Sequence, residues 1–139
     1  MATADREALA AAVFDGCPNL FLPAIVTPLT PDREIDTASA RTLCAAMFRQ
    51  GAGGLYVCGN TGEGMHLSEE ARQSMALVAV QETAKAGGGR VCIIHVGAAQ
   101  PDEALRLAKH ARDIGASAVS SLPPFVTHFS FAYTVEFYT

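Results

Sequence analysis

The 139-residue chain is long enough to bury the core of one domain, with half of its residues hydrophobic and 17% charged. These proportions exclude a disordered polypeptide. The formal net charge of −4 argues against a nucleic-acid partner, which needs clustered Lys and Arg. No apolar run approaches a membrane span, so no membrane partner is expected. Asp5 and Glu7 precede a short apolar stretch, which suits neither a secretory signal nor a transit peptide.

The four cysteines contain no CxxC pair, and Cys58 and Cys92 lie in apolar, strand-like runs. We interpret them as reduced core thiols, and we therefore expect a reducing, cytoplasmic setting. Their spacing relative to His66 and His95 matches no zinc pattern, so we expect no metal and no other cofactor. His95 stands between apolar neighbours and is expected to be a hydrogen-bonded core histidine.

The first part of the chain predicts a strand, a helix and a second strand. Residues 21–27 form an apolar run typical of a buried strand, which Pro28 ends. Residues 37–50 are rich in Ala with apolar residues at helical spacing, and Gly51 closes this helix. Residues 54–58 predict the second strand.

Ser68 predicts the start of the next helix, because its hydroxyl can cap the first turn and two acidic residues follow near the positive end of the dipole. This helix is expected to extend to about Lys85, before three consecutive glycines. Residues 90–96 then predict a third strand.

Pro101 opens a third predicted helix, in whose first turn proline is tolerated, and Gly115 ends it. At 100° per residue one face of this helix is apolar: Ala104, Leu107, Ala108, Ala111 and Ile114. Residues 116–122 predict a fourth strand, and residues 130–139 begin a fourth helix.

The pattern therefore gives four β-then-α units with continuous apolar strands, which is typical of a parallel α/β sheet buried on both faces. Two architectures fit this pattern. One is a small doubly wound sheet, and the other is a (β/α)8 TIM barrel, which needs about 250 residues. A chain of 139 residues is either the former or a part of the latter.

Residues 59–64 (GNTGEG) connect the second strand to the following helix and suggest an anion site. The glycine spacing differs from the dinucleotide fingerprint, the Walker lysine is missing, and Glu63 would repel a phosphate. A small carboxylate fits better, held by the Thr61 hydroxyl and backbone N–H groups. The alternative is a tight turn in which glycine supplies unusual φ angles and Thr61 is only a cap.

Several segments resemble the N-acetylneuraminate lyase and dihydrodipicolinate synthase family. The resemblance extends from about residue 20 to the end of the chain. It is carried by residues 22–29 (LPAIVTPL), 54–64 (GLYVCGNTGEG), 67–72 (LSEEAR), 94–98 (IHVGA), 118–125 (AVSSLPPF) and 129–131 (FSF). The loop motif is the specific part, and the other segments support it by their order and spacing.

This resemblance implies a class I, pyruvate-dependent aldolase on a (β/α)8 TIM barrel, in which a late lysine forms a Schiff base with pyruvate. The chain would be the first half of the barrel, about four βα units, with residues 1–20 as an N-terminal extension and residues 21–139 as a partial barrel that stops in the fourth helix. Asn60 and Thr61 would bind the pyruvate carboxylate, although the family usually has Ser or Thr at position 60. Gly59, Gly62 and Glu63 would shape the loop.

The sequence departs from the family pattern where the covalent chemistry should be. Lys85 and Lys109 both fall on predicted helices, whereas a Schiff-base lysine lies desolvated at a strand end. Tyr133 and Tyr138 belong to the fourth helix and cannot replace the family's acid–base tyrosine on the fifth strand. After the fourth strand some relatives carry a further tyrosine, and His128 is the nearest polar side chain here.

We therefore assign no catalytic residue and expect the chain to be inactive alone, which leaves open whether it is an enzyme. By resemblance its small-molecule partner is pyruvate, and it is expected to form a homo-oligomer or to aggregate as an isolated half barrel. The Ser120–Phe125 segment (SSLPPF) favours the sialic-acid lyases slightly over the lysine-biosynthesis enzymes. The alternative is a self-contained α/β module that binds a small acid or another subunit without catalysis.

Overall fold

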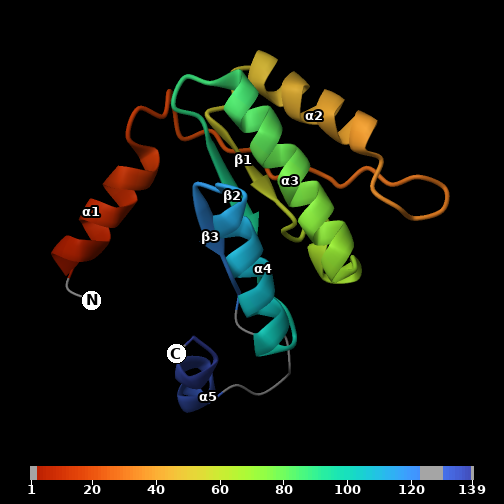
Figure 1. Cartoon of the computed structure of the whole chain (residues 1–139). Coiled ribbons are helices and arrows are strands. Elements are labelled where there is room, and N and C mark those ends of the chain that lie inside the picture. The colour runs from red at the N-terminus through yellow and green to blue at the C-terminus, as the bar shows by residue number, and fades with distance from the viewer. Residues whose placement is uncertain (1–2, 123–129, 139) are drawn as a thin grey trace.

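A computed structural model describes residues 3–122 and 130–138, in which helices cover one face of a small parallel sheet (Figure 1). The helices are α1 (Thr3–Phe14), α2 (Thr37–Arg49), α3 (Glu69–Ala86), α4 (Pro101–Asp113) and α5 (Phe131–Tyr138), with a 3-10 turn η1 (Gly64–His66). The strands are β1 (Gly54–Val57), β2 (Val91–His95) and β3 (Ala118–Ser120). α1 lies in the expected N-terminal extension. None of the helices in these ranges combines the length and the hydrophobicity of a membrane span.

The sheet is parallel throughout, in the order β1-β2-β3. Its register places Tyr56 beside Ile93 and Ile93 beside Ala118. α3 connects β1 to β2, and α4 connects β2 to β3 on the same side of the sheet (Figure 1). The alternating β and α elements confirm the predicted βα units, as expected for parallel strands joined by helical crossovers.

The first predicted strand, residues 21–27, is reduced to a single parallel bridge from Ala24 to Tyr56. The Ile25 N–H donates to the Tyr56 carbonyl at 3.1 Å, and the Tyr56 N–H donates to the Pro23 carbonyl at 3.0 Å. Pro23 has no N–H and so cannot extend the ladder. The segment thus occupies the position of the predicted strand with less regular pairing.

Helix starts and ends follow the sequence signals. The Ser68 hydroxyl accepts a hydrogen bond from the Ala71 N–H at 3.2 Å and caps α3, as predicted. Asp36 caps α2 in the same way through the Ser39 N–H at 3.0 Å. On α4 the buried residues are Leu107 and Ala111, both on the face predicted to be apolar. The predicted features at residues 123–129, including His128, lie outside the described residues.

One face of the sheet carries the core. Side chains that point toward α3 and α4 are almost completely buried: Leu55, Val57, Cys92 and Ile94. On the opposite face Tyr56 and Ile93 are only half-buried, whereas Val91 and His95 are buried, so the expectation of strands buried on both faces holds only in part. The opposite strands that would fill the interior of a closed barrel are not among the described residues, which explains this difference.

The edges of the sheet are apolar and unpaired in the described residues. Val119 in β3 is 48% exposed and Leu122 is 43% exposed. On the other edge Phe21 is 60% exposed and Val26 is 53% exposed. Open edges of this kind are templates for pairing with another chain.

We predict that the isolated chain associates through these edges. At low micromolar concentration it should elute from a size-exclusion column as a dimer or a larger species. Val119→Lys should shift elution toward the monomer, because a charge on an edge strand opposes pairing. Leu77→Lys, at a position of α3 that is 40% exposed, is the matched control and should not change elution. A wild-type monomer that melts cooperatively would contradict association through these edges.

Candidate functional site

The predicted carboxylate loop follows β1 directly, at the end of the sheet where the carboxyl ends of the strands lie. Gly59 is buried, whereas Asn60 and Thr61 are both exposed. The N–H groups of Asn60 and Thr61 donate no hydrogen bond to any residue in the described part of the chain. The loop therefore presents free donors and two polar side chains where parallel α/β proteins bind ligands.

The glycines of the loop are needed because neighbouring atoms leave no room for a Cβ atom, and not because the backbone there has unusual angles. The left-handed conformations belong to Cys58, with φ of 59°, and Glu63, with φ of 51°. A Cβ atom at Gly64 would overlap the carbonyl oxygen of Cys58, and one at Gly59 would lie 2.5 Å from the Tyr56 ring. The expectation that glycine supplies unusual φ angles here is therefore wrong, because close backbone packing excludes side chains at these positions.

Backbone hydrogen bonds and one hydroxyl fix the loop. The Gly64 N–H donates to the Gly59 carbonyl at 3.1 Å, and the Thr27 hydroxyl donates to the Gly62 carbonyl at 2.6 Å. Thr27 lies at the end of the first extended segment, residues 21–27. Its hydrogen bond therefore fixes the loop to this neighbouring segment. Glu63 contributes its N–H, which donates to the Asn60 carbonyl at 3.0 Å, while its side chain does not cap the 3-10 turn.

A polar pair that the sequence analysis missed lies across the half-buried face of the sheet. The hydroxyls of Tyr56 on β1 and Ser120 on β3 are 2.7 Å apart. Ser120 is beside His95 in the register of β2 and β3. Alternation along the strands could have placed Tyr56 on this face, but the pairing with Ser120 depends on the register of three strands.

His95 is buried, as expected, but the expectation of a hydrogen-bonded ring is wrong. Its side chain is 2% exposed, and neither ring nitrogen has a hydrogen-bond partner among residues 3–122 and 130–138. Burial and, to a smaller extent, the charge of Arg72 lower the pKa of His95 below its ordinary value. The buried guanidinium of Arg72 donates to the His95 carbonyl at 2.9 Å and lies 3.6 Å from the Glu103 carboxylate.

The cysteines are free thiols, and Cys44, Cys58 and Cys92 are buried, which agrees with the interpretation as reduced core residues. Burial raises the pKa of Cys58 to about 11 and that of Cys92 to about 12, so both stay protonated at neutral pH. No group of three or more His, Cys, Asp or Glu side chains in residues 3–122 and 130–138 is arranged to hold a metal ion.

Both lysines lie on helices, as predicted. Lys85 is in the last turn of α3, and its ammonium pairs with the Glu82 carboxylate at 2.6 Å. Lys109 is exposed on α4. Neither lies at the end of a strand beside Asn60 and Thr61.

Comparison with known proteins identifies a family along most of the chain. The sequence profile of the Dihydrodipicolinate synthetase family matches residues 18–139. N-acetylneuraminate lyase from Citrobacter koseri is 37% identical over 118 residues, which is 84% of this chain and 38% of the relative. The chain thus spans less than half the length of this curated relative.

Solved structures agree with the sequence comparison. N-acetylneuraminate lyase from Mycoplasma synoviae superposes with a TM-score of 0.77 at 30% identity, over 84% of this chain and 40% of that one. YagE, a prophage protein of the dihydrodipicolinic acid synthase family from Escherichia coli, was solved in complex with pyruvate. It superposes over 84% of this chain and 38% of its own with a TM-score of 0.77 at 24% identity, which shows the fold alone. The prediction of the first half of a (β/α)8 barrel is confirmed.

Cys58 provides a test of the backbone strain in the loop. Cys58→Gly should be more stable than Cys58→Ala by about 1 kcal/mol, because only glycine adopts positive φ without strain. At Cys92, in a regular strand, the order should reverse, with glycine less stable than alanine by about 0.5–1 kcal/mol. Chemical denaturation of the four variants measures both differences. If the glycine and alanine variants had the same order of stability at both positions, backbone strain at Cys58 would be contradicted.

His95 predicts a pH dependence of stability. Its pKa is lowered in the folded state, so between that value and about 6.5 the unfolded chain binds a proton that the folded chain does not. Stability should therefore fall as the pH drops below about 6.5, by up to about 1.4 kcal/mol per pH unit. His95→Gln should flatten this fall between pH 7.5 and 5.5, whereas His66→Gln, at an exposed residue, should not. Equal slopes for wild type and His95→Gln would refute this assignment.

Proposed function

Since the chain belongs to the dihydrodipicolinate synthetase family, we propose that it supplies the carboxylate-binding half of a pyruvate-dependent aldolase or lyase. The proposal rests mainly on one observation, the closely packed loop at the end of β1 with two exposed residues, Asn60 and Thr61, whose N–H groups donate to no residue that the structure describes. A carboxylate can accept hydrogen bonds from these groups and from the Thr61 hydroxyl.

In this proposal Asn60 and Thr61 orient pyruvate by its carboxylate, and Gly59, Gly62 and Glu63 keep the loop in shape. Asn60 can donate a hydrogen bond to the carboxylate, but its amide cannot relay a proton as the family's usual hydroxyl does. The Tyr56–Ser120 hydroxyl pair lies on the half-buried face of the sheet, where it can hold a water or a substrate oxygen.

The covalent catalyst is proposed to come from outside the 139 residues. Lys85 is ion-paired on α3 and Lys109 is exposed on α4, so neither is desolvated as a Schiff-base lysine must be. The complete reaction would form or cleave a C–C bond between pyruvate and an aldehyde. The curated relative from Citrobacter koseri supports an N-acetylneuraminate lyase type over a dihydrodipicolinate synthase type.

Assembly and location are proposed on similar grounds. The open edges of the sheet support a homo-oligomer or a complex with a complementary half barrel. The buried, protonated thiols support a reducing, cytoplasmic setting. Residues 1–20 remain an N-terminal extension and residues 21–139 a partial barrel in this proposal.

Pyruvate binding tests the role of the loop. Thr61→Val removes the hydroxyl at nearly constant shape and should raise the Kd for pyruvate about tenfold, the cost of one hydrogen bond to a charged group. Thr42→Val is the control, because the Thr42 hydroxyl is bonded to the Ala38 carbonyl on α2. Isothermal titration calorimetry compares the three proteins. Equal affinities of all three proteins for pyruvate would contradict a role of the Thr61 hydroxyl in binding.

Borohydride trapping tests the absence of the covalent step. Incubation with pyruvate and borohydride should leave the chain unmodified in intact-mass spectra, since Lys85 is ion-paired and Lys109 is exposed to water. A stable adduct on Lys85 or Lys109 would contradict this proposal. A cooperative monomer that binds pyruvate without forming an adduct would instead support the self-contained binding module.

A further inference from the structure

The hydroxyl pair of Tyr56 and Ser120 connects β1 to β3 across the middle strand of the sheet. Tyr56 pairs with Ile93 of β2, which in turn pairs with Ala118 of β3. The Tyr56 side chain therefore crosses β2 to reach Ser120, with 2.7 Å between the two hydroxyl oxygens. Because neighbouring strands lie about 4.8 Å apart, this connection spans about 10 Å of sheet. Ser120 follows Ala118 along β3, so the ring extends toward the carboxyl end of the strands.

The ring of Tyr56 also lies against the start of the carboxylate loop. A Cβ atom at Gly59 would lie 2.5 Å from Cε1, 3.1 Å from Cδ1 and 3.6 Å from Cζ of this ring. The Gly59 carbonyl accepts the Gly64 N–H at 3.1 Å, which closes the loop, and Asn60 follows Gly59 directly. The position of the ring therefore determines how closely the first residue of the loop approaches the sheet.

Both ends of the connection are attached to fixed backbone. The Tyr56 N–H donates to the Pro23 carbonyl at 3.0 Å, and the Tyr56 carbonyl accepts the Ile25 N–H at 3.1 Å. On β3 the Ser120 carbonyl accepts the Val96 N–H at 2.8 Å. The side chains of Tyr56 and Ser120 lie on the half-buried face, where packing restricts a ring less than in a closed core. The hydrogen bond between the hydroxyls adds the restraint that packing does not supply.

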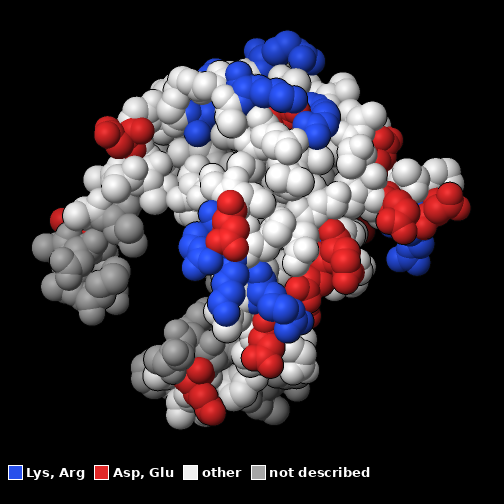
Figure 2. Space-filling model, in the orientation of Figure 1, with Lys and Arg blue, Asp and Glu red and all other residues white. Residues whose placement is uncertain are grey.

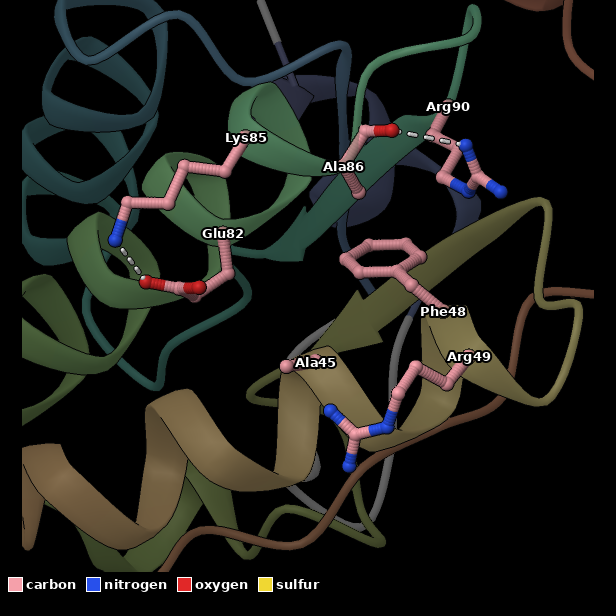
Figure 3. A pocket seen from close by; sticks show the side chains of 7 residues that line it. All are labelled: Ala45, Phe48, Arg49, Glu82, Lys85, Ala86 and Arg90. Carbon is pink, nitrogen blue, oxygen red and sulfur yellow. Dashed lines mark hydrogen bonds and ion pairs between the residues drawn. The ribbon is translucent and has the colours of Figure 1, made fainter.

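Charged side chains provide no comparable link to the loop in the described part of the chain. Figure 2 shows basic side chains where α2 and α3 end and charged side chains of both signs along α4. Their ion pairs hold the helices, since Arg41 of α2 and Lys85 of α3 both pair with Glu82, the latter at 2.6 Å (Figure 3). Glu63 in the loop pairs with no cation among the described residues. The loop is therefore held by neutral hydrogen bonds and close packing.

We propose that Tyr56 is a positioning residue of the carboxylate loop, and that Ser120 on β3 holds its ring in the position that the loop requires. This inference rests on the proposed role of the loop in binding pyruvate by its carboxylate. The ring fixes Gly59, and Gly59 in turn places the N–H groups of Asn60 and Thr61 at the end of β1. The site then depends on all three strands, although its binding groups come from one loop.

Amide NMR of the ligand-free chain tests the position of the loop. Tyr56→Phe and Ser120→Ala each remove one hydroxyl, and both should shift the Gly59 and Asn60 amide resonances, because the ring current of the aromatic side chain acts on Gly59. The double variant should show no further shift, since both changes break the same hydrogen bond. Ser120→Thr keeps a hydroxyl and should retain the wild-type resonances. Added salt should leave them unchanged, because it screens ion pairs and not neutral hydrogen bonds.

Pyruvate titrations of the same variants test the effect on binding. Tyr56→Phe and Ser120→Ala should each raise the Kd about fivefold, the effect of one neutral hydrogen bond, and the double variant should raise it by the same factor. Ser117→Ala is the matched control, because the Ser117 hydroxyl accepts the Cys92 N–H at 3.0 Å next to the amino end of β3. It should lower the midpoint of chemical denaturation without shifting the Gly59 resonance or raising the Kd.

Unchanged loop resonances, or an unchanged Kd for pyruvate, in both Tyr56→Phe and Ser120→Ala would overturn the positioning role. Effects of the two changes that add in the double variant would also overturn it. A wild-type chain that binds no pyruvate would contradict the proposed function, while the ligand-free resonances would still decide whether the hydroxyl pair positions the loop.

Discussion

The candidate site depends on how closely the backbone packs on itself where β1 ends. The Cys58 carbonyl lies against Gly64, the Tyr56 ring lies against Gly59, and the Thr27 hydroxyl holds the Gly62 carbonyl. A side chain at these glycines would push the loop away from the strand. These contacts hold the backbone of the loop in place, so Asn60 and Thr61 lie on an ordered turn, which lowers the ordering cost of binding a small carboxylate.

The sequence was sufficient for the parts of the fold that local patterns determine. Ser68 gave the start of α3, and the apolar stripe on α4 gave its buried face, because capping and helical periodicity act over one or two turns. The first strand is shorter than the apolar run of residues 21–27 predicts, since Pro23 interrupts its ladder. The loop glycines differ from the prediction for another reason. Their neighbours in space, Cys58 and Tyr56, are set by the three-dimensional turn and not by local composition.

The polar groups of the sheet could not be predicted in the same way. The Tyr56–Ser120 contact joins residues 64 positions apart and depends on the register of β1, β2 and β3. The pattern of the sequence marks His95 only as buried, and it cannot show that the imidazole has no hydrogen-bond partner among the residues that the structure describes. Both lie on the face of the sheet that the opposite strands would cover in a closed barrel.

The most direct test of the carboxylate loop is a pyruvate titration followed by amide NMR of the labelled chain. The account predicts saturable shifts of the Asn60 and Thr61 amide resonances, because their N–H groups become hydrogen-bonded to the carboxylate. The Arg90 amide, at the opposite end of the βα unit, should not move. Saturable shifts confined to Arg90 and its neighbours, or no saturable shift at Asn60 and Thr61, would contradict the central claim.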